Sequence, residues 1–201
     1  MKKSRAILFI ALITLLSVFA VACGGGTGQD VSQEQGGEQA AADAPGAGFT
    51  EYPIGDAVQA EGMNIAAVYF QAVPMAPEDK AGLGPDEADI HIEADISALK
   101  NNPMGFGFGQ FVPYLTIKYE MENKDSGEKV SGSFMPMNAG DGSHYGANVK
   151  MLGAGEYHLT YTIEAPKDFL LHTDEETGVP GRHWKKPVVV EWDFSWLGRK
   201  F

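Results

Sequence analysis

Residues 88–96 alternate strictly between two kinds of side chain, and this pattern constrains the fold more than any other feature of the sequence. Apolar residues occupy every second position, and the positions between them hold Asp89, His91, Glu93 and Asp95. Because successive side chains of a β-strand point to opposite faces, a period of two over this length predicts a half-buried strand. One face of that strand packs on a core, and the other carries ionisable groups.

Comparable patterns recur along the chain, and no segment has a convincing helical period. Strands are predicted at residues 64–73, 88–99, 112–122, 128–137, 147–152, 156–164 and 187–196. The turn-forming residues 123–127 separate two of these strands and predict a hairpin. Seven strands with turns between them predict an all-β fold, an antiparallel β-sandwich of immunoglobulin-like or cupredoxin-like type.

The first 22 residues have the pattern of a secretory signal peptide. Lys2, Lys3 and Arg5 precede an apolar run over residues 6–21, which is short for a membrane span. Small residues then lead into Cys23, an arrangement that resembles the bacterial lipobox, in which the cysteine is lipidated. The alternative is a plain signal peptide with Cys23 as a free thiol. Cys23 is the only cysteine, so the chain can form no internal disulfide.

Residues 23–47 are predicted to be a disordered tether behind the lipidated cysteine. They consist mostly of Gly, Ala, Gln, Glu and Asp, which bury too little surface to offset the entropy of ordering. The remaining residues, 48–201, are enough for one domain with its own core. We therefore expect a domain that is anchored to the cell envelope by lipid and faces the periplasm or the cell exterior.

The charge of the chain excludes one class of partner. It has 15 basic and 27 acidic residues, and removal of the signal peptide leaves 12 basic residues and a net charge of −15. Such a surface repels nucleic acid and attracts cations. The sequence also lacks a phosphate-binding loop, a dinucleotide fingerprint and the zinc-protease pattern HExxH.

Two segments carry candidate metal ligands. His91 and Glu93 are two residues apart on one strand face, with their Cα atoms about 6.5–7 Å apart, so that both side chains can converge on one ion. Their alternative interpretation is a solvated outer face. Met135 and Met137 end another predicted strand, and a glycine-rich loop then allows His144 to return toward Met137. Thioether and imidazole ligands suit copper, although methionine is also a common core filler.

The segments together resemble a known family. The matching stretches are GFTEYPIG (48–55), AAVYFQAVPM (66–75), EADIHIEADI (87–96), FVPYLTI (111–117), FMPMNAGDGSHYGANVKM (134–151) and HTDEETGVPGR (172–182). They resemble the periplasmic iron-transport-associated proteins that bind copper and other divalent metals, including related spirochaetal surface lipoproteins. The resemblance covers essentially all of residues 48–201.

The resemblance implies a fold, a site and a role. The fold is an immunoglobulin-like sandwich that forms a homodimer, with a metal site near the dimer interface. That site binds copper and also takes iron, zinc or manganese, and its ligands are His91, Glu93, Met137, His144 and His172. Such proteins are not enzymes and work with an inner-membrane iron permease. His158 and His183 match no ligand of the family, and we assign them to a strand surface and a loop.

Three hypotheses remain open beside this interpretation. Asp89, Asp95 and Asp141 are candidates for a weaker, oxygen-rich site for iron or manganese. The chain as a whole is alternatively a surface lipoprotein that captures a host or partner protein, with metal-assisted dimerisation. The third hypothesis is an oxidoreductase that acts on iron or copper, for which the sequence offers no organic-cofactor motif.

Overall fold

The structure is a computed structural model, and it describes residues 50–198. The predicted signal peptide (1–22), the lipidated Cys23 and the tether (23–47) lie outside the described residues. In the described part of the chain, no helix is long and apolar enough to cross a bilayer.

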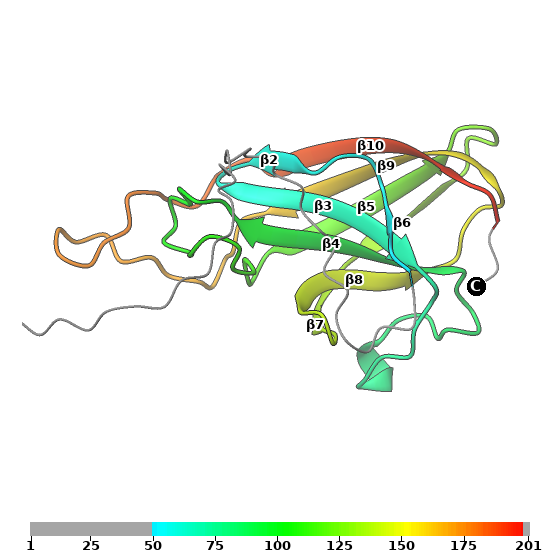
Figure 1. Cartoon of the computed structure of the whole chain (residues 1–201), viewed down its shortest axis with the longest axis horizontal. Helices are drawn as coiled ribbons and strands as arrows, with labels where there is room; N and C mark the ends of the chain where they lie inside the picture. Colours follow the sequence, from blue (N-terminus) through cyan, green and yellow to red (C-terminus); the bar gives the residue numbers. More distant parts are fainter. Residues whose placement is uncertain (1–49, 199–201) are drawn as a thin grey trace, which may run out of the picture. The chain divides into compact units, whose positions relative to one another are not determined.

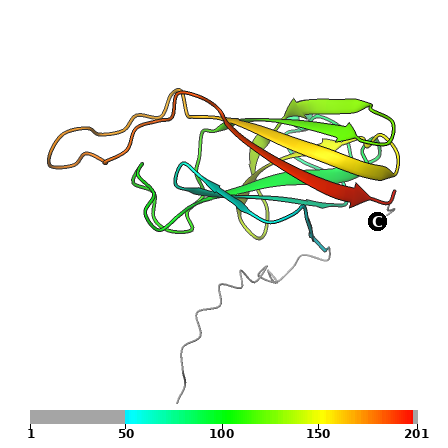
Figure 2. The same cartoon turned by 90° about the horizontal axis from the view of Figure 1, so that it is seen from above.

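Two antiparallel sheets face each other in the described domain (Figures 1 and 2). Sheet A has the order β1-β3-β4-β8-β7, and β2 also pairs with β3. Its strands are β1 (Tyr52–Pro53), β2 (Val58–Ala60), β3 (Met63–Phe70), β4 (Ile90–Ala98), β7 (Met135–Asn138) and β8 (Ser143–Val149). Sheet B has the order β10-β9-β5-β6, with β5 (Thr116–Asn123), β6 (Lys129–Ser133), β9 (Gly155–Glu164) and β10 (Val188–Trp196). A short 3-10 turn, η1 (Glu78–Lys80), lies between β3 and β4. The predicted all-β sandwich is confirmed.

The core lies between the two sheets, and the alternating strands supply it. From β4 it receives the apolar side chains Ile90, Ile92, Ala94, Ile96 and Ala98. From β9 it receives Tyr157, Leu159, Tyr161 and Ile163, all fully buried. Each large apolar side chain buried in this way stabilises the fold by about 1.5–3 kcal/mol relative to an exposed one. The predicted alternation along β4 is therefore confirmed, and it turns His91 and Glu93 away from this core.

The chain changes sheets at Phe134, where the sequence predicts one continuous strand over residues 128–137. The Phe134 ring is buried, stacks on Tyr119 at 4.9 Å between centroids and meets Tyr161 edge-on at 5.0 Å. Its N–H donates to the carbonyl of Ile117 at 2.9 Å, after which the chain leaves sheet B and enters β7 of sheet A. The predicted β5–β6 hairpin is confirmed, but the single strand is wrong, because a buried aromatic side chain fixes the crossover.

The following strand also begins earlier than its sequence pattern indicates. The sequence predicts a strand over 147–152, whereas β8 runs from Ser143 to Val149. A tight turn joins β7 to β8, with the Ala139 N–H donating to the Gly142 carbonyl at 2.8 Å. Gly142 has a φ of 149°, which L residues rarely adopt. As a result His144 lies on a strand and not in the glycine-rich loop.

Two long connections are not part of the sheets. Residues 71–89 join β3 to β4 and carry η1. Residues 165–187 join β9 to β10 and extend beyond the end of the sandwich as a long loop, drawn in orange in Figure 1. Both connections bear on the site described next.

Candidate metal centre

His91 and Glu93 lie on the face of sheet A that points away from the core, and yet both are buried, with 1% and 3% of their surfaces exposed. The connection 71–89 covers part of this face of sheet A, and it is hydrogen bonded to Asn148 of β8. Gly146 stands opposite Glu93 in the register between β8 and β4 and has no side chain to fill the space. Because ionisable groups are seldom buried without a charged partner or a metal ion, this face is a candidate site.

Three ligand atoms converge there. Glu93 Oε1 lies 3.5 Å from His91 Nε2 and 2.9 Å from His144 Nε2. The three ligand atoms all lie within 4.8 Å of one another. His144 Nε2 is buried and makes no hydrogen bond, although it is close to the carboxylate. Bonds of about 2.0–2.1 Å to one ion place neighbouring ligand atoms about 2.9–3.4 Å apart, and the two separations from Glu93 Oε1 are close to this range.

The electrostatic environment differs between the two histidines. Burial lowers the pKa of His91, although the hydrogen bond with Asn148 and the charge of Glu93 act against it. Burial also acts to lower the pKa of His144, but the attraction of Glu93 outweighs it, with contributions from Asp95 and Asp141, and the net pKa is raised. His91 is therefore neutral at neutral pH and ready to act as a ligand. A metal ion has to compete with a proton at His144.

Met137 lies opposite His144 in the register between β7 and β8. Directly opposite residues of an antiparallel pair project to the same face of the sheet. The Met137 side chain is half-buried and stands on the side of sheet A that holds the three ligand atoms. The sequence-predicted ligands His91, Glu93, Met137 and His144 thus occupy one face of neighbouring strands, β4, β8 and β7.

His172 is not brought to this face in the single chain. It lies in the extended loop 165–187, with a side chain that is 74% exposed. Its Nδ1 atom is 2.7 Å from the hydroxyl of Thr177 in the same loop. The fifth predicted ligand therefore belongs to a different surface of the chain.

A group of carboxylates borders the three ligand atoms. Burial and the neighbouring Glu93 raise the pKa of Asp95 to about 6. Glu51, just before β1, has its pKa raised to about 7, first by burial and then by Glu93, Asp95 and Asp141. Neighbouring carboxylates disfavour the charged form of a carboxyl group, and a bound proton relieves this repulsion. The sequence pattern did not reveal Glu51, which nothing in its own segment distinguishes from an ordinary surface acid.

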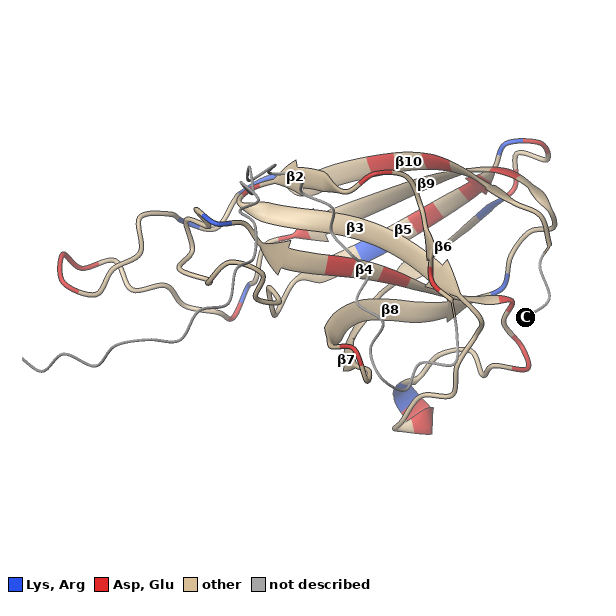
Figure 3. Ribbon diagram, in the orientation of Figure 1, with Lys and Arg blue, Asp and Glu red and all other residues tan. Residues whose placement is uncertain are grey.

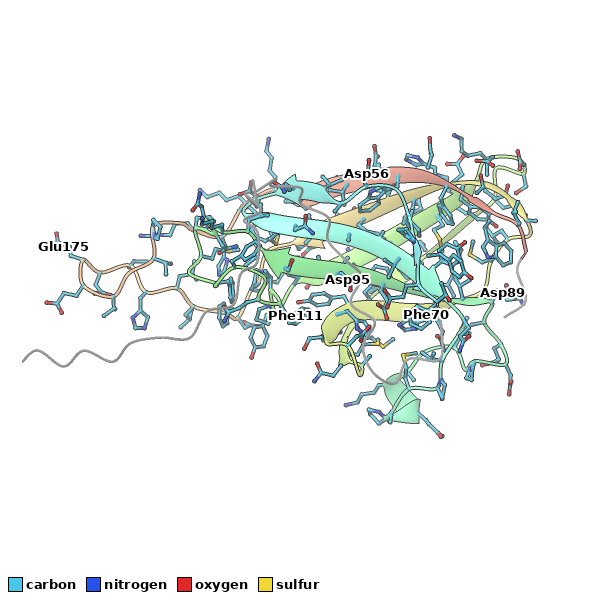
Figure 4. The ribbon with its side chains drawn as sticks, in the orientation of Figure 1. Asp56, Phe70, Asp89, Asp95, Phe111 and Glu175 are labelled. Atoms are coloured by element: carbon cyan, nitrogen blue, oxygen red, sulfur yellow. The ribbon has the colours of Figure 1, made fainter. Side chains whose placement is uncertain are left out.

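Asp89 is not part of this group, which corrects the hypothesis that placed it beside Asp95 and Asp141. Its Oδ1 atom is paired with Lys150 at 2.8 Å, and its Oδ2 atom accepts a hydrogen bond from the Met151 N–H at 2.9 Å. Figure 4 shows Asp89 and Asp95 well apart along β4. Figure 3 shows the acidic bands that interrupt β4 in an otherwise uncharged part of sheet A. Alternation puts both residues on the same side of the strand, but Asp89 lies beyond the end of the site.

The two remaining histidines are elsewhere, as the sequence indicates. His158 is on β9 of sheet B, where its Nδ1 atom is 2.7 Å from Asp193. His183 is in the extended loop, with Nε2 2.7 Å from the carbonyl oxygen of Phe169.

Known proteins share this fold and much of its sequence. Residues 48–198 match the model of a family described as Fe2+ transport protein. The chain is 43% identical over 198 residues to the 34 kDa membrane antigen of Treponema pallidum, covering 94% of this chain and 97% of that protein.

Two solved structures are similar to the described domain. FetP of uropathogenic Escherichia coli strain F11 is 51% identical, with a TM-score of 0.70, over 76% of this chain and all of that one. Copper-reconstituted P19 of Campylobacter jejuni is 49% identical, with a TM-score of 0.70, over 73% of this chain and 96% of that one. A family match over three quarters of the residues, together with relatives of this identity, is decisive: the chain belongs to the Fe2+ transport protein family.

Proposed function

We propose that this chain is an extracytoplasmic, lipid-anchored copper-binding protein that supports iron uptake. The observation that carries the proposal is the buried convergence of His91, Glu93 and His144, with ligand atoms within 4.8 Å of one another. Copper is named in the structures of P19 and of a FetP variant, both from relatives with about half their residues in common with this chain. The role is binding and delivery of metal, not enzymatic turnover.

The donor set suits copper on chemical grounds. Two imidazoles and a carboxylate match Cu(II), and the thioether of Met137 is a soft ligand for Cu(I). A set of mixed softness holds both oxidation states without imposing the geometry of either. Zinc, iron and manganese are further ions that imidazole and carboxylate ligands accept.

We propose that the site is completed in a homodimer, with His172 supplied by a second copy of the chain. In one chain His172 is exposed on the extended loop, where its Nδ1 atom lies beside the hydroxyl of Thr177. Exposed apolar side chains lie on this loop and on the segment packed against its base: Leu170 is 88%, Phe108 77% and Tyr114 65% exposed. The Tyr114 ring stacks on Phe169 of the loop at 5.2 Å. An exposed apolar patch of this kind is typical of an association surface.

Copper titration of the purified chain tests the site. We expect one tightly bound copper ion per chain in the wild type and a loss of affinity of at least tenfold in His144→Ala and in Met137→Ala. His158→Ala is the matched control, because His158 pairs with Asp193 on the other sheet. Copper binding that neither site substitution changes would place the metal elsewhere.

Mixing two inactive variants tests the origin of His172. A heterodimer of His172→Ala and His144→Ala chains contains one intact site, formed by His144 of the first chain and His172 of the second. We expect each homodimer to bind copper weakly and the mixture to regain one tight site per heterodimer. If the mixture binds no better than its components, His172 is not shared between copies.

We further propose that Glu51, Asp95 and Asp141 form an oxygen-rich site for iron or manganese beside the copper site. The support is the raised pKa of Asp95, about 6, and of Glu51, about 7, to both of which the charge of Asp141 contributes. Manganese titration of the copper-loaded chain, followed by electron paramagnetic resonance, tests it. Asp141→Asn should abolish manganese binding and preserve copper binding, whereas Asp86→Asn, an equal change of charge at an exposed position, should alter neither.

The setting in the cell follows from the family and from the N-terminal sequence. We propose that Cys23 is acylated and that the domain delivers iron to an inner-membrane permease. Mass spectrometry of the membrane-extracted protein should show acyl chains on the N-terminal cysteine. Cross-linking in cells grown at low iron should capture the permease, and capture should be lost in a Cys23→Ser chain.

A further inference from the structure

Asn148 has an unusually complete set of contacts for one buried amide. It lies on β8 directly opposite His91 of β4 and is 5% exposed. Its Nδ2 atom donates to the carbonyl oxygens of Val73 at 2.8 Å and Leu83 at 2.9 Å. Its Oδ1 atom accepts from the Val73 N–H at 3.2 Å and lies 2.9 Å from His91 Nδ1.

These contacts fix the orientation of the amide. Carbonyl oxygens only accept hydrogen bonds, so those of Val73 and Leu83 must face the NH₂ group of Asn148. The Val73 N–H, in turn, requires the amide oxygen. The oxygen end of Asn148 therefore faces His91, and the reverse orientation would lose all three backbone hydrogen bonds.

The orientation of Asn148 determines the tautomer of His91. An amide oxygen can only accept, so Nδ1 of the neutral imidazole must carry the proton that it donates. The other nitrogen, Nε2, then holds the free lone pair. That atom is the one that faces Glu93, at 3.5 Å. Without Asn148, the Glu93 carboxylate beside Nε2 would favour the opposite tautomer, with the proton on Nε2.

The same amide joins the covering connection to the site. Val73 and Leu83 come from two parts of the segment 71–89, and Gly82 forms an isolated bridge with Asn148. Figure 1 shows this segment, with η1, passing beside β8 and β7. One residue thus holds both the ligand and the segment that covers it.

We propose that Asn148 is a positioning residue that holds His91 in the Nδ1–H tautomer, with Nε2 free for metal, and couples this state to docking of residues 71–83. The proposal rests on the proposed metal function for its biological meaning, but the tautomer and the docking are properties of the metal-free chain. Hydrogen-bond partners of metal-bound histidines typically change metal affinity by about 10–100-fold when they are removed.

Two substitutions separate the two parts of the role. Asn148→Asp retains an acceptor for His91 but replaces the NH₂ group, so that a carboxylate oxygen faces the two carbonyls. Asn148→Leu has a similar branched shape and removes every hydrogen bond of the side chain. Asn64→Leu is the matched control, since Asn64 lies on the outward face of β3 in the same sheet.

The first measurement is ¹⁵N NMR of the histidine rings in the metal-free full chain, with hydrogen exchange of the backbone amides. In the wild type we expect a protonated Nδ1 and an unprotonated Nε2 at His91. In Asn148→Asp the proton on Nδ1 should persist, while amide exchange in residues 71–83 accelerates. In Asn148→Leu both the tautomer preference and the protection should be lost, and copper affinity should fall about 10–100-fold.

Each result has a definite meaning. A protonated Nε2 at His91 in the wild type overturns the proposal without any variant, whether or not the chain binds copper. An unchanged tautomer in a folded Asn148→Leu chain also overturns it, because Asn148 would then hold residues 71–83 in place without determining the tautomer of His91. Failure of the wild type to bind copper, with the tautomer as expected, would overturn the proposed function and leave the positioning role intact.

Discussion

Gly146 of β8 leaves the space that the His91 ring occupies: a Cβ atom at position 146 would lie 2.5 Å from His91 Nε2. That separation is shorter than any normal contact, and the atom affected is the candidate ligand atom itself. The φ angle of Gly146 is not in the left-handed region, so the reason for glycine here is the neighbouring ring and not the backbone.

Gly146→Ala should therefore weaken copper binding by at least tenfold, because the methyl group pushes His91 out of line with Glu93. Copper competition titration measures the change. Gly140→Ala is the control, since a Cβ there would meet no atom within 4 Å and should leave the affinity unchanged. Equal affinity in the Gly146→Ala chain would mean that His91 is not a ligand in its present position.

Met137→Leu should lower the affinity for Cu(I) more than that for Cu(II). The substitution conserves volume and removes only the thioether, which is the soft ligand of the set. Competition with a Cu(I)-specific chelator, compared with a Cu(II) titration, separates the two oxidation states. Met135→Leu is the comparison on the same strand, because Met135 projects to the same face of sheet A but lies opposite Gly146 and not opposite His144. A larger loss of Cu(I) affinity in Met135→Leu than in Met137→Leu would show that Met135 is the thioether ligand.

The contribution of Asp95 to the stability of the metal-free chain should fall as the pH rises from about 4 to 6. Burial raises the pKa of Asp95 from the ordinary 3.8 to about 6, so in this window the folded chain holds a proton that the unfolded chain releases. Stability from this group is fully present below pH 4 and is lost through pH 6. Asp95→Asn should therefore raise the free energy of unfolding by about 3 kcal/mol at pH 8 and change it little at pH 4.

Urea unfolding of the metal-free chain at the two pH values measures this difference. Asp86→Asn removes the same charge from an exposed position and should have a small effect at both. If Asp95→Asn raised the free energy of unfolding equally at both pH values, the cause would not be the ionisation of Asp95.

Copper should stabilise the chain by mass action, because the buried ligand set exists only in the folded state. Free copper at about 100 times its dissociation constant adds about 2.7 kcal/mol to the free energy of unfolding. Thermal unfolding with copper, and again after chelation, should show a reversible rise in midpoint. The rise should persist in His158→Ala and vanish in His144→Ala, and its persistence in the latter would point to another binding site.

The sequence by itself determined the strand character of residues 88–96 and the common face of His91 and Glu93. The reason is local, since a period of two assigns each side chain to one side of a strand whatever surrounds it. The glycine-rich segment after Met137 also allowed His144 to return toward Met137, and the register between β7 and β8 places the two residues opposite each other. The family resemblance rested on these same local patterns.

Only the tertiary structure decided which ionisable groups become a site. Burial of His91 and Glu93 depends on Asn148, which is 57 residues from His91 along the chain, and on the docking of residues 71–89 against it, which the period of the sequence does not express. The alternation assigns Asp89 and Asp95 to the same face, but six residues of extended chain, about 20 Å, separate them. Glu51 joins the site because the segment at β1 packs beside β3, a pairing that sequence period cannot express. Local periodicity fixes the direction of a side chain, whereas its dielectric surroundings and neighbours are set by contacts between remote segments.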